Sequence, residues 1–340
     1  MVGDCYDAVV VVSFGGPEKS EDVIPFLENV LRGRTTPRER MEEVAAHYYH
    51  FGGRSPINGQ NRALIAALRD ELHGHQITLP IYWGNRNWHP LLPDTVRQMK
   101  ADGVRRALAF VTSAFSSYSG CRQYREDIAR ARDAVGEGAP EIHKLRAFFN
   151  HPGFVRAVTD RARAALDQVP AGRRDHTSLL FTAHSVPLSM ASTSDYVPQL
   201  KETAGLISAA LHREEWQLVY QSRSGPPSQP WLGPDVSDAL RQLAAGGATD
   251  VVVVPLGFIS DHMEVVYDLD TEARAISESL GLNMIRAGTA GTHPLFVSMI
   301  RELIEERLSG CPARSLGVFG PRENLCREDC CPAPPRSLVR

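Results

Sequence analysis

A series of short apolar, β-branched runs, each ending in a loop of small residues, constrains this chain more than any other feature. Residues 7–14 end in Gly15-Gly16-Pro17, and residues 250–258, the strongest run, end just before Ser260. Such runs are typical of buried parallel strands. Further strands are expected at 77–83, 107–112, 177–183 and 218–221, and helical patterns at 23–31, 65–72 and 122–134. This alternation predicts an α/β fold with parallel sheets flanked by helices.

The two halves of the chain repeat one pattern. Residues 8–17 and 178–187 align without gaps at the strand and the closing proline, and residues 106–115 parallel residues 251–260. A duplication and a chance likeness of apolar strands both stay open at this point. At about 100–200 residues per domain, the length of 340 predicts two domains. We expect domains at 1–150 and 151–310, with a Cys-rich tail at 311–340. Strand-end loops of both domains would face one cleft, since open α/β sheets bind ligands there.

Composition excludes several classes of function. The formal net charge is -3, so no basic field attracts nucleic acid. No apolar run approaches the ~20 residues of a spanning helix. Residues 1–7 do not resemble a secretory signal, and a cytoplasmic location is therefore expected. Four of the six cysteines crowd the last thirty residues, which favours metal binding over disulfides in a reducing compartment.

A stripe of carboxylates marks the helix expected at 261–280, which Ser260 would cap. Asp261, Glu264, Asp268 and Glu272 recur at steps of 3, 4 and 4, which places them on one face. One interpretation is a solvated face with Asp261 complementing the helix dipole. The other is a carboxylate ladder that leads a divalent cation toward a site.

A second candidate is His184, which follows a buried strand and lies in a Ser/Pro loop. A histidine there is either structural or a group that ligates iron or accepts a proton near neutral pH. Histidine combined with a carboxylate suits ferrous iron.

Three ordered motifs resemble those of the ferrochelatase family. They are FTAHSVP at 181–187, YQSRSGP at 220–226 with WLGP at 231–234, and FISDHMEVVYDLD at 258–270. The similarity extends over residues 7–308 and is greatest to the coproporphyrin III ferrochelatases of Gram-positive, high-GC bacteria. It implies two Rossmann-like domains with a porphyrin cleft between them, and ferrous iron as a substrate.

The resemblance also implies roles for individual residues. His184 and Glu264 would be the catalytic pair at the iron site, and Asp268 and Glu272 a metal path leading away from it. The porphyrin contacts would come from the first domain, where the matching positions are Tyr48, Ser55, Tyr124, Arg32 and Arg34. The two arginines would bind propionates, which suits paired hydrogen bonds, or would simply end a charged helix.

Several functions remain open. Coproporphyrin III is favoured as the substrate over protoporphyrin IX, because the chain lacks the long apolar lip of the membrane-associated relatives. A non-catalytic porphyrin or haem carrier would not need both His184 and Glu264, and a cobalt or nickel chelatase would use similar ligands. A dinucleotide-dependent oxidoreductase is disfavoured, since no G-x-G-x-x-G follows a strand. The expected partners are the porphyrin and iron, with a monomer that makes transient contacts with neighbouring haem-pathway enzymes.

The chain departs from the family pattern at three positions. Phe14 and Asn87 replace a tyrosine and a histidine of some relatives, and phenylalanine cannot ligate a metal. Some ferrochelatases bind a [2Fe–2S] cluster through three tail cysteines and one internal cysteine, but the matching internal position here is Ala157. The expected tail ligands are Cys326, Cys330 and Cys331, with Cys311 as the fourth, or Cys121 brought in through the fold. Zinc and free thiols are the alternatives.

Overall fold

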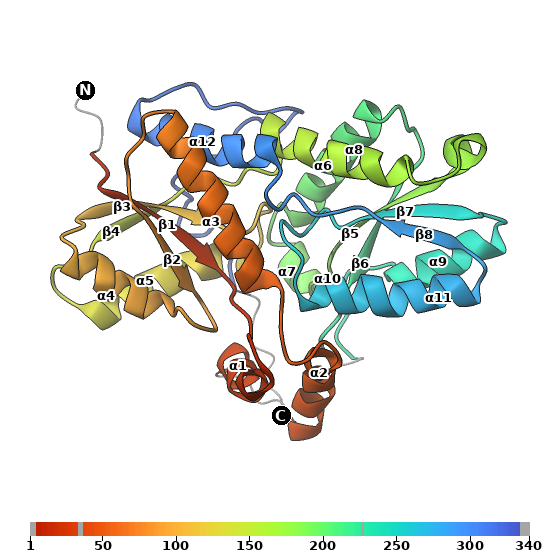
Figure 1. Ribbon diagram of the computed structural model, residues 1–340, viewed down its shortest axis with the longest axis horizontal. Helices are drawn as coiled ribbons and strands as arrows, with labels where there is room; N and C mark the ends of the chain where they lie inside the picture. Colours follow the sequence, from red (N-terminus) through yellow and green to blue (C-terminus); the bar gives the residue numbers. More distant parts are fainter. Residues whose placement is uncertain (1–4, 33–36, 226–227, 334–340) are drawn as a thin grey trace.

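Two parallel sheets of identical topology organise the protein (Figure 1). The structure is a computed structural model that describes residues 5–32, 37–225 and 228–333. The first sheet has the order β2-β1-β3-β4 and the second the order β6-β5-β7-β8, with every pairing parallel. The strands are β1 (Ala8–Ser13), β2 (Ile81–Asn85), β3 (Arg106–Val111), β4 (Glu141–Lys144), β5 (Ser178–His184), β6 (Gln217–Gln221), β7 (Asp250–Val254) and β8 (Asn283–Arg286).

Helices cover both faces of each sheet (Figure 1). In the first half they are α1 (Val23–Val30), α2 (Arg38–His50), α3 (Ile57–Gly74), α4 (Leu92–Ala101) and α5 (Gln123–Val135). In the second half they are α6 (Pro152–Leu166), α7 (Leu188–Ala191), α8 (Tyr196–Ala210), α9 (Val236–Ala245), α10 (Met263–Tyr267), α11 (Arg274–Ser279) and α12 (Pro294–Leu308). Short 3₁₀ segments lie at η1 (Ser20–Asp22) and η3 (Ala171–His176), and π-helical segments at η2 (Tyr118–Arg122) and η4 (Asp268–Ala273).

The alternation along β1 explains this layering. Val9 and Val11 face a core that includes residues of α3, whereas Ala8, Val10 and Val12 face a second core formed with α4 and α5. All five side chains are fully buried, as expected of a central parallel strand covered on both faces. The α/β class with parallel sheets is thus confirmed. The first strands of the two halves, β1 and β5, hold equivalent places in their sheets, as do β3 and β7. These are the strand pairs that align in the sequence.

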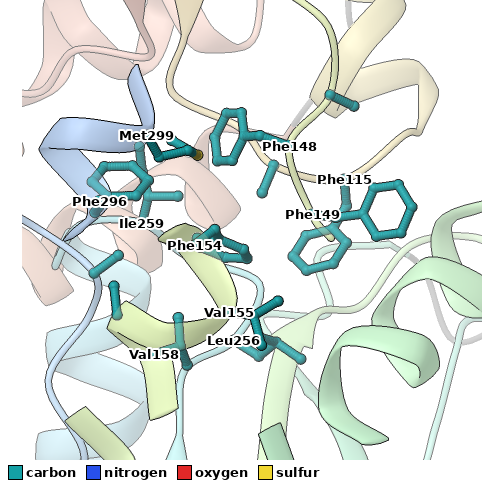
Figure 2. Close-up of a cluster of buried hydrophobic side chains, with 14 of the residues drawn as sticks. Phe115, Phe148, Phe149, Phe154, Val155, Val158, Leu256, Ile259, Phe296 and Met299 are labelled. Atoms are coloured by element: carbon teal, nitrogen blue, oxygen red, sulfur yellow. The ribbon is translucent and has the colours of Figure 1, made fainter. Parts of the chain in front are cut away.

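A shared aromatic core joins the two domains (Figure 2). The ring of Phe148, in the link between β4 and α6, lies 5.4 Å from that of Phe110, 5.6 Å from that of Phe154 and 5.9 Å from that of Phe296. Phe296 belongs to α12, which follows the second sheet in sequence yet packs against α3 of the first domain as well as against α6. Because these rings are close-packed, this core holds the two domains in one relative orientation.

The acidic helix differs from its prediction. It is expected as one α-helix over 261–280, but it consists of α10, η4 and α11, with a π-helical segment in the middle. It begins at Met263, and the cap is His262, not Ser260, since Nδ1 of His262 accepts from the Glu264 N–H. Among the described residues, none of the helices is both long and apolar enough to span a bilayer.

Candidate functional site

His184 and Glu264 lie together at the carboxyl edge of the second sheet. His184 is the last residue of β5, and Glu264 lies in the first turn of α10, which follows the neighbouring strand β7. Nε2 of His184 is 3.6 Å from Oε2 of Glu264, and the two side chains retain 31% and 45% of their exposure. The pair is therefore formed in the fold and is accessible to a ligand.

Each member of this pair shifts the pKa of the other. Burial alone would lower the pKa of His184, but the charge and hydrogen bond of Glu264 outweigh it and raise the pKa to about 9. Burial would raise the pKa of Glu264, but His184 outweighs it and lowers that pKa to about 2. At neutral pH the pair is therefore an imidazolium beside a carboxylate.

Backbone contacts orient both side chains. Nδ1 of His184 donates to the carbonyl of Ser185, which leaves Nε2 facing Glu264. The Tyr196 hydroxyl donates to the His184 carbonyl at 3.0 Å, and Nε2 of Gln221 donates to the Glu264 carbonyl at 2.7 Å. Contacts from the start of α8 and the end of β6 thus hold the His184–Glu264 pair in place.

His262 is a site residue that the sequence reasoning did not assign. It lies inside the third motif, which was a usable signal, and its Nδ1 is 4.0 Å from Oε2 of Glu264. Burial lowers its pKa, so its imidazole is neutral at pH 7 and able to accept the Glu264 N–H at 3.2 Å. It holds the first turn of α10 in place.

Three of the four predicted carboxylates of the stripe stay near one another, and the fourth does not. The Ser222 hydroxyl donates to Asp268, whose pKa is raised to about 7, first by burial and then by the charges of Glu264 and Glu272. Asp261 precedes the helix, and its carboxylate instead accepts from Arg286 at 3.1 Å. A divalent cation at this edge would reduce the repulsion between these three carboxyl groups, which contributes to the raised pKa of Asp268.

The first domain contributes Tyr48 and His47 from α2. Burial, followed by the charges of Glu264 and Asp268, raises the pKa of Tyr48, so its phenol is protonated and lies near those two carboxylates. The His47 ring stacks on Tyr267 with centroids 3.7 Å apart. The site is therefore bounded by both domains.

The other residues predicted to contact the porphyrin range from buried to exposed. Ser55 is only 4% exposed, its N–H donates to the Pro17 carbonyl at 2.9 Å, and it lies two residues before the start of α3. Tyr124 is buried under the guanidinium of Arg86, 4.5 Å from its ring. Arg32 is exposed and donates to Asn29 at 2.5 Å. Arg34 lies outside the described residues.

Phe14 and Asn87, the two first-domain residues that depart from the family pattern, both make contacts within that domain. Phe14, directly after β1, packs edge-on against Phe26 with centroids 6.2 Å apart. The Asn87 carbonyl accepts from Asn29 at 3.2 Å. Phe14 offers no ligand atom, so any protein ligand to a metal has to come from other residues.

The tail places its thiols beside Cys121 instead of Cys311. Cys121 and Cys326 lie close enough to shift each other's pKa, which is lowered to about 7 at Cys326, chiefly by Cys121, and raised at Cys121, chiefly by Cys326. Sγ of Cys330 is 3.7 Å from Sγ of Cys331. Cys311 is exposed, and its Sγ is 3.2 Å from the Ser309 hydroxyl. In donor type, the four gathered thiols fit a four-thiolate group. Within 5–32, 37–225 and 228–333, however, no three His, Cys, Asp or Glu side chains are arranged to hold one ion.

Solved structures share this architecture. SirB from Bacillus subtilis with Fe³⁺ superposes with a TM-score of 0.55 at 12% identity, covering 90% of this chain and 97% of its own. The sirohydrochlorin chelatase SirB from Bacillus subtilis subspecies spizizenii in complex with cobalt has a TM-score of 0.51 at 10% identity, with the same coverage. The chain thus has the two-domain fold of the chelatases.

Sequence comparison gives the family. The ferrochelatase profile matches residues 6–308. A ferrochelatase of Rhodopirellula baltica is 56% identical over 97% of this chain and 95% of its own length. Coproporphyrin III ferrochelatases of Frankia alni and Nocardia farcinica are 55% and 52% identical, covering 97% and 92% of this chain and 87% and 91% of their own. The chain belongs to the ferrochelatase family, the enzymes that insert ferrous iron into a porphyrin in haem biosynthesis, as the motifs predicted.

Proposed function

We propose that this enzyme inserts ferrous iron into coproporphyrin III, with His184 and Glu264 as the reacting pair. The observation that carries the proposal is the 3.6 Å approach of Nε2 of His184 to Oε2 of Glu264 at an accessible strand end. The choice of coproporphyrin III is supported by the names of the relatives from Frankia alni and Nocardia farcinica. The relative from Rhodopirellula baltica carries the broader name ferrochelatase.

The chemistry requires that two pyrrole N–H protons leave as one Fe²⁺ enters, so two protons are released per metal inserted. The resting pair already holds one proton on His184. An arriving dication repels the imidazolium and lowers its pKa, so that proton is expelled and a neutral imidazole and a carboxylate remain. These two groups then accept the pyrrole protons. Glu264 passes its proton to solvent as the pair returns to its resting state, so that this proton and the one expelled from His184 are the two released per Fe²⁺. Asp268 and Glu272 form the path by which iron arrives.

The porphyrin would lie against the first domain. Ser55, Tyr48 and Tyr124 would contact the macrocycle, and Arg32 and Arg34 its propionates, since arginine binds carboxylates through paired hydrogen bonds. Coproporphyrin III carries four propionates and protoporphyrin IX two.

An anaerobic metallation assay tests the substrate. We expect kcat/KM with Fe²⁺ to be larger for coproporphyrin III than for protoporphyrin IX, and Co²⁺ and Ni²⁺ provide the metal controls. A preference for protoporphyrin IX would overturn the choice of substrate. Tight porphyrin binding without turnover would instead support the non-catalytic carrier.

We further propose that Cys121, Cys326, Cys330 and Cys331 bind a [2Fe–2S] cluster, with Cys121 in the place first expected for Cys311. The contact between Cys121 and Cys326 supports this choice, as does the short separation of Cys330 and Cys331. When bound, the cluster would supply an electron-transfer or structural centre.

The ligand set is tested on protein purified anaerobically. We expect a reddish-brown protein whose visible absorption is lost in Cys121→Ser and Cys326→Ser but kept in Cys311→Ser, the matched control. Retention in Cys121→Ser with loss in Cys311→Ser would restore the first assignment. Stoichiometric zinc, or metal-free active protein, would select the zinc or the free-thiol alternative. The monomeric state, the transient contacts with pathway enzymes and the cytoplasmic location stay predictions.

A further inference from the structure

The first turn of α3 carries three amide side chains that point to different domains. Asn58 donates to the Gly16 carbonyl at 3.0 Å, and Asn61 donates to the Ser13 hydroxyl at 2.8 Å, so both fix α3 to the end of β1. Gln60 lies between them in sequence and reaches the second domain. Its side chain connects this anchored turn to the loop that leads to Glu264.

Gln60 makes a two-point contact with Asp261. Its Oε1 accepts from the Asp261 backbone N–H at 2.8 Å, and its Nε2 donates to Oδ2 of the same residue at 3.2 Å. The other carboxylate oxygen of Asp261 accepts from Arg286 at 3.1 Å, and Arg286 also binds Asp270 through two nitrogens, at 2.6 and 2.8 Å. Both carboxylate oxygens of Asp261 thus accept hydrogen bonds, one from Gln60 of the first domain and one from Arg286 of the second.

We propose that Gln60 is a positioning residue that sets, across the domain interface, where Glu264 lies relative to the porphyrin held by the first domain. The inference rests on the proposed function of His184 and Glu264. Asp261 directly precedes His262, whose Nδ1 caps α10 at the Glu264 N–H. On the other side, Gln60 is five residues beyond Ser55, a proposed porphyrin contact, on the same anchored segment.

The physical reason is that metallation demands a fixed distance between the ring nitrogens and the reacting pair, and the two lie on different domains. A displacement of about 1 Å costs on the order of 100-fold in rate. A cavity of about 290 Å³ borders both Gln60 and Asp261, so water would fill the gap left by a truncated Gln60 and would not restore the contact. The porphyrin contacts themselves stay intact, which separates the effect on kcat from that on KM.

The test uses full-length Gln60→Ala, Gln60→Glu and the double variant Gln60→Glu/Asp261→Asn. We expect Gln60→Ala to lower kcat about tenfold while KM for the porphyrin stays within about twofold. Gln60→Glu should lower kcat further because two carboxylates then face each other. The double variant exchanges the hydrogen-bond polarity and should recover most of the kcat lost in Gln60→Glu. Gln98→Ala is the matched control, since Gln98 is a helical glutamine bonded to Asp102 on the surface of α4.

An NMR spectrum of protein labelled with ¹⁵N-histidine tests the same geometry and does not require turnover. We expect the ring signals of His184 and His262 to shift in Gln60→Ala and to return in the double variant. Unchanged kcat and unchanged signals in Gln60→Ala, or no recovery in the double variant, would overturn the inference. A wild-type enzyme that fails to metallate would overturn the proposed function alone, because the histidine spectra would still decide the role of Gln60.

Discussion

The imidazole of His47 lies flat on the phenol ring of Tyr267, with centroids 3.7 Å apart and planes 10° from parallel. This contact ties α2 of the first domain to the acidic helix between Glu264 and Asp268. Stacked aromatic pairs contribute about 0.5–1.5 kcal/mol beyond their buried area. We therefore expect Tyr267→Ala to speed amide hydrogen exchange in α2 by roughly 2- to 10-fold. Tyr267→Phe keeps the stacking face and should leave exchange unchanged; equal acceleration in both variants would contradict the prediction.

Removal of the imidazole at His184 should abolish metallation. We expect His184→Ala to lower kcat by about 10²- to 10⁴-fold, the usual contribution of a proton-transfer group, while the porphyrin Kd changes little. Fluorescence titration with the porphyrin and anaerobic turnover measure the two quantities. His176→Ala, at the exposed end of η3 just before the same strand, is the control. Wild-type turnover in His184→Ala would remove this residue from the mechanism.

The carboxylates along the acidic helix should differ in importance. Glu272 lies eight residues, or about 12 Å at 1.5 Å per residue, beyond Glu264. We expect Glu264→Gln to cost at least tenfold more kcat than Glu272→Gln, because only Glu264 contacts His184. Glu278→Gln, on an exposed position of α11, should have no effect. Equal losses at 264 and 272 would argue against a graded path that ends at Glu264.

Two first-domain residues should affect the porphyrin and not the metal. Ser55→Ala and Tyr124→Phe each remove one hydroxyl, and a hydrogen bond contributes about 1 kcal/mol, or roughly fivefold in Kd. We expect the Kd for coproporphyrin III to rise by about that factor while KM for Fe²⁺ is unchanged. Tyr82→Phe, which loses a surface bond to Asp102, is the control. A selective change in KM for iron would place these hydroxyls on the metal side.

Acid should destabilise the protein through His151. This residue is fully buried, and its Nδ1 accepts from the Gly153 N–H at 3.1 Å at the start of α6. Burial, with Arg146 and Arg314, lowers its pKa from 6.5 to about 3, and this outweighs the Glu302 carboxylate 3.3 Å from Nε2. The unfolded chain therefore binds a proton below pH 6.5 that the folded chain does not, so stability falls as the pH drops from 6.5 toward 3.

The size of this effect follows from the shift. Between pH 7 and pH 5, His151 should reduce the free energy of unfolding by about 2 kcal/mol. His151→Asn keeps a cap acceptor at the helix start and should remove that part of the pH dependence. Urea unfolding at both pH values measures it. An identical slope in the variant would show that other groups cause the acid lability.

Much of the fold and of the site could be predicted from local patterns. The β-branched runs at 8–13 and 250–254 form strands that are buried on both faces of their sheets. Such strands are continuously apolar, because neither face is exposed to water, and they can therefore be predicted from the sequence. His184 and Glu264 each lie beside a strand end, and parallel strands bring their ends to one edge. A regular spacing also placed Glu264, Asp268 and Glu272 on one helix, although η4 interrupts its α-helical geometry.

Tertiary packing decided the rest. Gln60 and Asp261 are 201 residues apart, and Cys121 and Cys326 lie in different segments with no motif in common. No local sequence pattern identifies such pairs, because a single glutamine or cysteine can occur at any position on a protein surface. Gln60 meets Asp261 because α12 and the phenylalanine cluster of Figure 2 fix one domain against the other. Cys326 lies near Cys121 because the tail packs on the first domain, where Arg122 donates to the Glu328 carbonyl. Asp261 is likewise not part of the predicted stripe of carboxylates on the helix. It binds Arg286, at the end of β8, instead. Sequence periodicity therefore determined the elements, the resemblance to the ferrochelatase motifs singled out His184 and Glu264, and the packing between domains determined which polar groups hold that pair in place.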